Sequence, residues 1–204
     1  MTKNEILQCD VLFLCVSISS LESVLSDISK NLKPGCLVFD TCSVKVHPVN
    51  LMKSILPANI DIIASHPMFG PDSGKNGVKD LPIVFIPVRD NSGYADKWRK
   101  IFLDMEMKVI EISADMHDKD AAFTQGVTHF IGRVLNELNL KESEISTMGY
   151  KNLLSIVEQT CNDPLQLFMD LQHYNPYTHN MRRELNDSLK KTMDMLASAD
   201  PYLD

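Results

Sequence analysis

The sequence predicts an α/β domain followed by an all-α domain. In the first half of the 204-residue chain, short apolar runs alternate with segments of helical apolar spacing. Beyond residue 113 no strand-like run appears, and long segments of helical period fill the remaining sequence. Alternation of strands and helices at this spacing is typical of βαβ units in a mostly parallel sheet. We therefore expect a boundary near Ser113, with domains at residues 1–113 and 114–204.

Five runs in the first half are expected to form strands, because they are short, apolar and bounded by turn-forming residues. They lie at residues 10–16, 36–40, 59–64, 81–88 and 107–112. Segments with helical apolar spacing separate them at residues 21–32, 48–56 and 93–103. The first of these helices is expected to stop at Lys33-Pro34-Gly35, since proline and glycine end helices.

Four helical segments are predicted in the second half. They cover residues 114–139, 145–161, 165–172 and 176–199. The pairs Asp163-Pro164 and Asn175-Pro176 separate the last three, because the residue before a proline disfavours helical backbone.

Composition and charge narrow the class of protein. The chain has 44% hydrophobic and 23% charged residues, as globular proteins do. Its net charge of -7 argues against nucleic acid or an anionic membrane as the main partner. No apolar run reaches the roughly 18 residues of a membrane-spanning helix, and the first ten residues lack signal-peptide character. We expect a cytoplasmic protein.

The five cysteines also favour a cytoplasmic location. Most of them stand in apolar contexts, and their number is odd, which is typical of reduced, buried thiols. No C-x-x-C pair exists, and the stretch HYNPYTH with two histidines lacks carboxylates, so we expect no metal site.

A histidine follows the third predicted strand, in the sequence SHPMFGPDSGK at residues 65–75. This places His66 at the carboxyl end of a strand, where open parallel α/β sheets bind ligands. A histidine with a pKa near neutrality can take a proton from an alcohol during its oxidation. The alternative is a histidine whose hydrogen bonds are satisfied by the loop backbone.

A serine follows the second predicted strand, in DTCSVK. If the two turns line one crevice, Ser43 and His66 are neighbours, and the serine hydroxyl could orient the ring or a cofactor. Ser43 could equally be the N-cap of the next helix.

Several polar or small residues share one face of the predicted helix 114–139, at spacings of three and four: Gln125, Thr128, His129 and Gly132. This pattern indicates a groove along an otherwise apolar helix. The alternative is a helix-packing seam that contains one hydrogen-bonded histidine.

Four further charged or titratable positions have ordinary structural explanations. Asp163 stands before a proline, as the N-cap of a following helix does. The pair His117-Asp118 could cap the long helix that it begins, and Lys151 is expected to be a solvated helix charge.

The glycines provide no phosphate-binding turn. A dinucleotide-binding sheet opens with a strand and G-x-G-x-x-G at a helix N-terminus, and nothing in this sequence matches that pattern. The first half is therefore either a different α/β domain or the later part of a nucleotide-binding one.

Five stretches, in order along nearly the whole chain, resemble the prephenate/arogenate dehydrogenases of tyrosine biosynthesis. They are DVLFLCVSISSLESVL, VFDTCSVK, SHPMFGPDSGK, HDKDAAFTQGVTHFIGRVL and GYKNLLSIVEQTCNDP, and the last two look most like the plant-type arogenate dehydrogenases. The resemblance implies the C-terminal portion of a Rossmann-like NAD(P) domain, then a helical domain through which a homodimer forms. It also implies oxidative decarboxylation of a cyclohexadienyl alcohol, with hydride transfer to NAD(P).

The resemblance assigns roles residue by residue. His66 matches the catalytic histidine that bonds the ring hydroxyl, Ser43 the serine near it and the nicotinamide, and His129 the histidine of the helical domain that faces the same pocket. The resemblance also implies that Asp72, Gln125 and Thr128 bind the substrate. Ser17 and Ser43 are the residues expected to bind the cofactor.

Two positions bear on the choice of substrate. Many microbial relatives carry a carboxylate-binding arginine where Ser155 stands here, which leaves Lys151 and Arg133 as candidates for that role. In the plant-type branch an aspartate near Asp163 is associated with arogenate, whose ammonium group a carboxylate can pair with. We expect arogenate to be preferred over prephenate.

The resemblance begins at about the fourth strand of the family's nucleotide domain. We therefore expect weak dinucleotide binding and little turnover by the chain, with NADP favoured and NAD possible as cofactor. The alternative is a non-catalytic, truncated paralogue that acts as a dimerisation module. A plant-like source would imply a plastid, although we expect no transit peptide in this sequence.

Overall fold

A computed structural model describes residues 2–198, apart from the side chains of Pro71 and Asp72. The chain divides into two compact units, Met1–Lys119 and Asp120–Asp204. The predicted boundary near residue 113 coincides with the start of helix α6 (Ala114–Ala121), and the division falls inside that helix.

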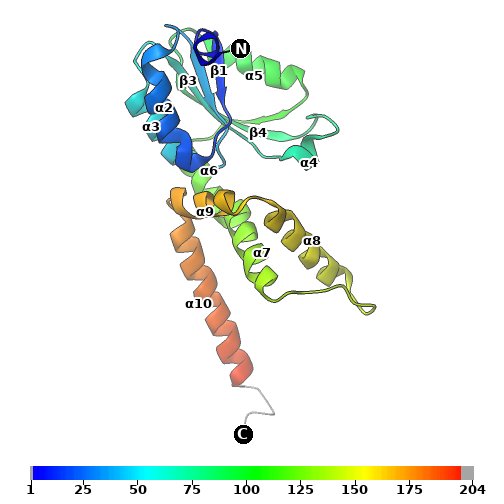
Figure 1. The fold of residues 1–204 in the computed structure, drawn as a ribbon. Helices are drawn as coiled ribbons and strands as arrows, with labels where there is room; N and C mark the ends of the chain where they lie inside the picture. The colour runs from blue at the N-terminus through cyan, green and yellow to red at the C-terminus, as the bar shows by residue number, and fades with distance from the viewer. Residues whose placement is uncertain (1, 199–204) are drawn as a thin grey trace. The chain divides into compact units, whose positions relative to one another are not determined.

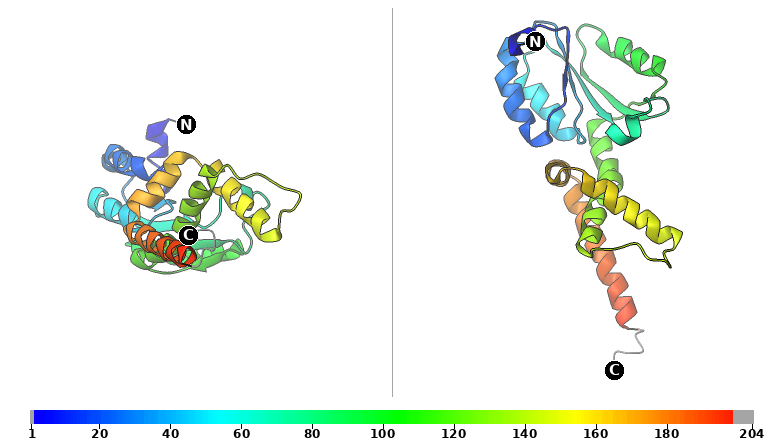
Figure 2. Two further views of the ribbon diagram at one scale, coloured as in Figure 1. Left: turned by 90° about the horizontal axis from the view of Figure 1, so that it is seen from below. Right: turned by 45° about the vertical axis from the view of Figure 1, so that its right-hand side comes forward.

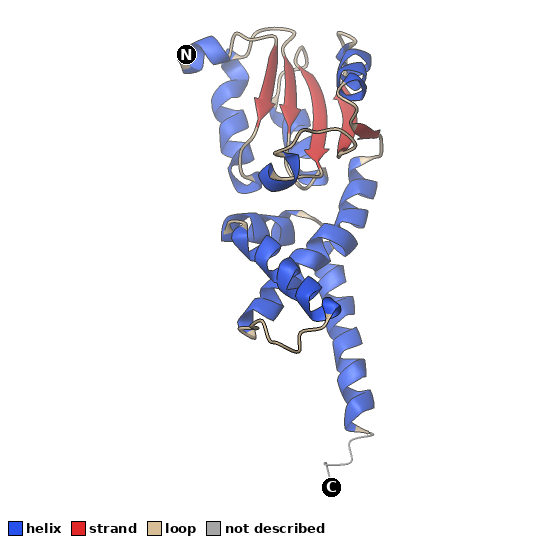
Figure 3. Ribbon diagram, turned by 90° about the vertical axis from the view of Figure 1, so that its right-hand side faces the viewer, coloured by secondary structure: helices blue, strands red, loops and turns tan. Residues whose placement is uncertain are grey.

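The first unit is built on a five-stranded sheet, shown in red in Figure 3, with the order β1-β2-β3-β4-β5. The strands are β1 (Val11–Leu14), β2 (Leu37–Asp40), β3 (Asp61–Pro67), β4 (Pro82–Arg89) and β5 (Lys108–Ile110). Three of the four pairings are parallel, which confirms the predicted mostly parallel sheet, and β3 pairs with β4 antiparallel. The loop between β3 and β4 contains only the short helix α4 (Pro71–Gly74), because an antiparallel pair needs no crossover helix.

Helices cover both faces of this sheet. Figure 1 and the right-hand view of Figure 2 show α2 (Leu21–Ile28) and α3 (Val46–Ile55) on one face and α5 (Tyr94–Asp104) on the other. Phe102 of α5 is buried together with Phe39, Phe85 and aliphatic residues of the strands. A short helix that the sequence did not predict, α1 (Lys3–Ile6), begins with a Thr2–Glu5 capping box.

In the described residues of the second unit, helices joined by loops are the only regular secondary structure (Figure 3). After α6, the predicted long helix passes through a π-helical turn, Ala122–Gly126, into α7 (Val127–Glu137). Then follow α8 (Met148–Asn162), α9 (Leu165–Tyr174) and α10 (Thr178–Ala197). α7 packs against both α8 and α10. Residue 199, the predicted end of the last helix, lies outside the described residues.

Among residues 2–198, no helix combines the length and the apolar character that crossing a membrane requires.

Candidate active site

Three candidate residues stand at the carboxyl edge of the parallel strands. His66 lies near the end of β3, Ser43 follows β2, and Ser17 follows β1. Because β1, β2 and β3 are mutually parallel, these positions occupy the same edge of the sheet. This is the edge at which α/β sheets bind nucleotides.

A series of side-chain hydrogen bonds connects His66 to a second histidine and an aspartate. Nδ1 of His66 lies 2.9 Å from Nε2 of His117, and Nδ1 of His117 lies 2.8 Å from Oδ1 of Asp118. All three side chains are buried, and that of His66 is only 3% exposed. The two histidines come from β3 and α6, so the fold brings together residues that are far apart in the sequence.

Asp118 also caps a helix. Its two carboxylate oxygens accept the backbone N–H groups of Lys45 (2.6 Å) and Val46 (2.8 Å) at the start of α3. The predicted capping role of this aspartate therefore exists, but on a different helix from the one expected. It also excludes Ser43 as the cap, because α3 has Lys45 at its N-cap and no cap bond from its own segment.

A buried ion pair contacts the backbone next to His66. The Lys45 ammonium group donates to the carboxylate of Asp40 and to the backbone oxygen of Ser65, and both ionised side chains are fully buried. Burial raises the pKa of Asp40, and the Lys45 charge opposes that rise. Oδ2 of Asp40 has no hydrogen-bond partner among the described residues.

This environment keeps His66 neutral. Burial lowers the pKa of His66 well below 6.5, and the charges of Lys45 and His117 lower it further. A neutral imidazole has one nitrogen with a free lone pair, which is the form that accepts a proton.

The two serines at this edge are more accessible. Ser43 is half-buried, and Ser17 is exposed in the turn before the 3-10 helix Ile18–Ser20, with its hydroxyl 2.7 Å from that of Ser20. The predicted roles of both serines stay predictions.

In the second unit, a polar face runs along the π-helical turn and α7. Gln125, His129 and Arg133 follow each other at spacings of four residues. Nε2 of His129 lies 3.9 Å from Oδ2 of Asp163, and Arg133 donates to the backbone oxygen of Asp163 at 2.7 Å. Burial lowers the pKa of His129, Asp163 partly restores it, and Arg133 lowers it further.

Each of these three side chains has a buried atom without a partner. They are Oε1 of Gln125, Nδ1 of His129 and Nε of Arg133, within the described part of the chain. Buried polar atoms in folded proteins nearly always have a hydrogen-bond partner, so this face is one where a water or a polar ligand would be expected. Gly132 of the same predicted face packs closely against Thr160 of α8, so this face combines a packing seam at Gly132 with unpartnered polar atoms on Gln125, His129 and Arg133, and the predicted groove stays a prediction.

The remaining candidates are placed differently. The Thr128 hydroxyl donates to the backbone oxygen of Thr124 at 2.9 Å, and Lys151 is exposed on α8. Asp163 ends α8, and the N-cap of α9 is Pro164, so the predicted N-cap role of Asp163 was wrong. Asp72 lies in α4, but its side chain is outside the described residues.

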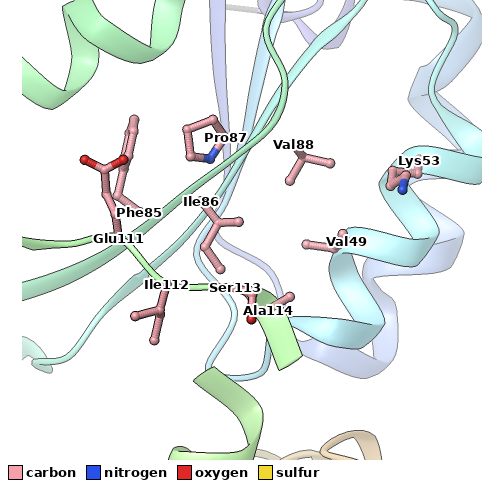
Figure 4. A pocket seen from close by; sticks show the side chains of 10 residues that line it. All are labelled: Val49, Lys53, Phe85, Ile86, Pro87, Val88, Glu111, Ile112, Ser113 and Ala114. Carbon is pink, nitrogen blue, oxygen red and sulfur yellow. The ribbon is translucent and has the colours of Figure 1, made fainter. Parts of the chain in front are cut away.

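An open pocket of about 620 Å³ lies elsewhere in the first unit, between α3, β4 and the segment 111–114. Figure 4 shows Val49 and Lys53 of α3 opposite Ile86 and Val88 of β4. None of the predicted site residues lines this pocket, and its wall is mostly apolar. The buried polar groups near His66 therefore mark the candidate site better than this hollow does.

The described residues contain no group of three or more His, Cys, Asp and Glu side chains that could hold a metal ion.

A family model described as "Prephenate dehydrogenase, nucleotide-binding domain" matches residues 2–110, more than half of the chain. The chain belongs to the prephenate dehydrogenase family. A second model, "TYRAAT1-like, C-terminal domain", matches residues 134–201. The family assignment made from the sequence is thereby confirmed.

Two plant members of this family are similar over most of the chain. Arogenate dehydrogenase 2, chloroplastic, of Arabidopsis thaliana is 39% identical over 193 residues, which are 90% of this chain and 54% of the relative. Arogenate dehydrogenase 1, chloroplastic, of the same species is 42% identical over 173 residues, which are 82% of this chain and 27% of the relative. The predicted likeness to plant-type members is confirmed, and the chain spans about half or less of these relatives' length.

Solved structures of the family share the fold. Synechocystis arogenate dehydrogenase has a TM-score of 0.71 at 16% identity, over 98% of this chain and 76% of that one. The prephenate dehydrogenase from A. aeolicus, in complex with hydroxyphenyl propionate and NAD+, has a TM-score of 0.74 at 17% identity, over 100% of this chain and 76% of that one. These likenesses confirm the predicted fold class.

Proposed function

We propose that this chain carries the catalytic groups of an NAD(P)-dependent arogenate dehydrogenase that also accepts prephenate. The observation that carries the proposal is a neutral, buried His66 at the ligand-binding edge of the sheet, in a chain of the prephenate dehydrogenase family. Relatives that are named arogenate dehydrogenases support the choice of reaction.

In the proposed reaction, His66 binds the hydroxyl group of the cyclohexadienyl substrate and takes its proton. Bound NAD(P) supplies the acceptor for the hydride from the carbinol carbon. The bond to the ring carboxylate then breaks, carbon dioxide leaves, and its electron pair completes the aromatic ring. The proton held by the enzyme returns to the phenolic oxygen, so the protein itself has to position the reactants and hold one proton.

The carboxyl edge of β1, β2 and β3 fits the nicotinamide end of a dinucleotide, because parallel strands end there with small polar residues. Ser17 and Ser43 are the residues that we propose to contact it. We propose NADP as the preferred cofactor, with NAD as the second. The weak turnover predicted from the sequence stays a prediction.

The substrate's charged groups suit the polar face of the second unit. Arg133 is a candidate partner for a substrate carboxylate, since its guanidinium has a free buried Nε and packs 5.6 Å from the ring centroid of Phe168. Asp163 is a candidate partner for the ammonium group of arogenate. Asp163→Asn should then lower kcat/KM for arogenate relative to prephenate by about tenfold, the loss of one charge-assisted contact.

We also propose a homodimer that forms through the helical unit. Leu189, Met193 and Leu196 follow one face of α10 and are 61%, 60% and 58% exposed. An apolar stripe of this kind is typical of an association surface. Sedimentation equilibrium of the chain should give twice the monomer mass, and a monomer at all concentrations would contradict it. A cytoplasmic or plastid location stays a prediction.

The function is tested by titrating the purified chain with NADP and NAD in a calorimeter and by following arogenate oxidation through the reduced cofactor. We expect turnover that falls by about 10² to 10⁴ in His66→Gln, the range of general-base contributions. His173→Gln, on the exposed surface of α9, is the matched control and should leave turnover unchanged. Turnover that is the same in His66→Gln as in the unmodified chain would contradict the proposal, and a well-folded chain with neither cofactor binding nor any turnover would favour the non-catalytic dimerisation module.

A further inference from the structure

The hydrogen-bonded series His66–His117–Asp118 ends at the carboxylate of Asp118. Both of its oxygens accept backbone N–H groups, those of Lys45 and Val46, and such groups can only donate. These bonds lie at the N-terminus of the ten-residue helix α3, where the helix dipole favours a negative charge. Asp118 therefore only accepts hydrogen bonds.

This fixes the protons on both histidine rings. Nδ1 of His117 faces the Asp118 carboxylate at 2.8 Å and has to donate. In the neutral ring, Nε2 of His117 is then an acceptor, so Nδ1 of His66, 2.9 Å away, has to donate to it. The lone pair of His66 is thereby left on Nε2.

The two histidines differ in how well they hold a positive charge. His66 is buried close to the Lys45 ammonium group, and burial and that charge both lower its pKa. His117 is equally buried but lies directly against the Asp118 carboxylate. A proton that enters at His66 is therefore more stable once it has moved on to His117.

We propose that His66 and His117 form a proton relay, which rests on the proposed dehydrogenase function. The substrate's hydroxyl proton binds to Nε2 of His66, and the proton on Nδ1 of His66 moves to Nε2 of His117. One proton enters the pair and one shifts within it, so that the single positive charge ends on His117 and is paired with Asp118. When the aromatic product has formed, the same steps in reverse return a proton to its phenolic oxygen.

The charged groups around the relay are Lys45 on the His66 side, Asp40 behind that lysine, and Asp118 on the His117 side. Lys45 disfavours charge on His66, whereas Asp118 favours charge on His117. The asymmetry gives the relay its direction. His117 is thus a positioning and proton-holding residue that does not touch the substrate.

Long-range ¹⁵N–¹H NMR of the imidazole nitrogens, in the uniformly labelled chain, tests this without turnover. Spectra of His66→Gln and His117→Gln assign the two rings. At about pH 8 we expect both rings to be neutral with the proton on Nδ1. When the pair takes up one proton on acidification, the positive charge should rest on the ring next to Asp118, and in the same step the neutral His66 should change to the Nε2–H form. This coupled change is specific to the relay, because a merely structural histidine would not alter its neighbour's tautomer.

Three results would overturn the relay: a His66 ring that carries Nε2–H at high pH, a His66 that is protonated before His117, or no proton uptake by either ring. Kinetics separate this inference from the function on which it rests. If arogenate is oxidised, His117→Gln should lower kcat by about tenfold or more with KM within about twofold. Full kcat in His117→Gln would reject the relay and leave the proposed function intact. If no arogenate is oxidised, the NMR titration still decides the proton positions.

Discussion

Gly132 in α7 faces Thr160 in α8 so closely that a Cβ atom at position 132 would lie 2.0 Å from Oγ1 of Thr160. The threonine cannot easily turn away, because its hydroxyl donates to the backbone oxygen of Ile156 at 2.8 Å. α7 carries His129, and α8 ends at Asp163. The contact between the glycine and the threonine therefore sets the spacing of the two helices that carry the candidate substrate groups.

Gly132→Ala should destabilise the helical unit. The added methyl group has to push α7 and α8 apart, and overpacking of this kind costs about 1 to 3 kcal/mol in the free energy of unfolding. Urea unfolding followed by circular dichroism measures the change. Because Oγ1 of Thr160 is the nearest obstacle, the double variant with Thr160→Ala should recover part of the loss.

Gly149→Ala is the matched control on α8. A Cβ atom there meets only Oγ1 of Thr147 at 3.9 Å, which is ordinary contact. In a helix with free space, alanine for glycine stabilises by about 0.4 to 1 kcal/mol. Equal effects of the two substitutions would contradict the close packing of α7 on α8.

Asp163→Asn should lower the pKa of His129. The Asp163 charge raises that pKa, whereas burial and Arg133 lower it, so removing the charge leaves only the lowering effects. Arg133 bonds the backbone oxygen of Asp163, and asparagine keeps that bond. An NMR titration of the His129 ring measures the shift. Glu158→Gln, an exposed carboxylate on the same helix, should leave the titration unchanged, and an upward shift in Asp163→Asn would contradict the arrangement.

Lys45→Met should strongly destabilise the first unit, because it leaves the Asp40 carboxylate buried without its partner. Breaking one half of a buried pair costs about 3 to 5 kcal/mol, whereas replacing both halves by apolar residues is often neutral. The double variant Lys45→Met with Asp40→Leu is therefore expected to regain most of the stability. The loss in Lys45→Met should also shrink at lower pH, since an Asp40 with a raised pKa takes up a proton when folded.

Urea unfolding of these variants near pH 7 and pH 5 provides the measurement, and NMR of His66 provides a second one. The Lys45 charge lowers the pKa of His66, so that pKa should rise in Lys45→Met. An unchanged stability in the single variant would show that Asp40 and Lys45 do not form the buried pair.

The strands and most helices could be predicted because their signals are local. The apolar runs at residues 36–40 and 59–64 and the helical periods after residue 113 depend only on neighbouring side chains. His66 could be placed at the edge of the sheet for the same reason. The antiparallel pairing of β4 with β3 and the π-helical turn at Ala122–Gly126 depend on tertiary packing. Neither has a recognisable pattern in the local sequence.

The hydrogen-bonded partners of His66 could not be predicted from local sequence patterns. Asp118 caps a helix that begins more than seventy residues earlier, and nothing in the sequence around it indicates this contact. A His-Asp pair at the start of a helix is an ordinary sequence, and only the fold shows that His117 faces His66. The buried pair of Lys45 and Asp40 was missed for the same reason.

The share of the stability that depends on His66 and His129 should fall as the pH drops below about 6.5, because both have lowered pKa values in the folded state, whereas the raised pKa of Asp40 acts in the opposite direction. In the unfolded chain these rings bind protons near pH 6.5, whereas in the folded chain they stay neutral to lower pH. The unfolded state then binds more protons, so the free energy of unfolding decreases with falling pH, by at most about 1.4 kcal/mol per pH unit and histidine. Urea unfolding at several pH values between about 7.5 and 5.5 measures the slope. His66→Gln should reduce this slope by the contribution of one histidine. His173→Gln removes an exposed ring and should leave the slope unchanged. An equal slope in His66→Gln and in the unmodified chain would show that His66 binds protons equally in the folded and the unfolded state.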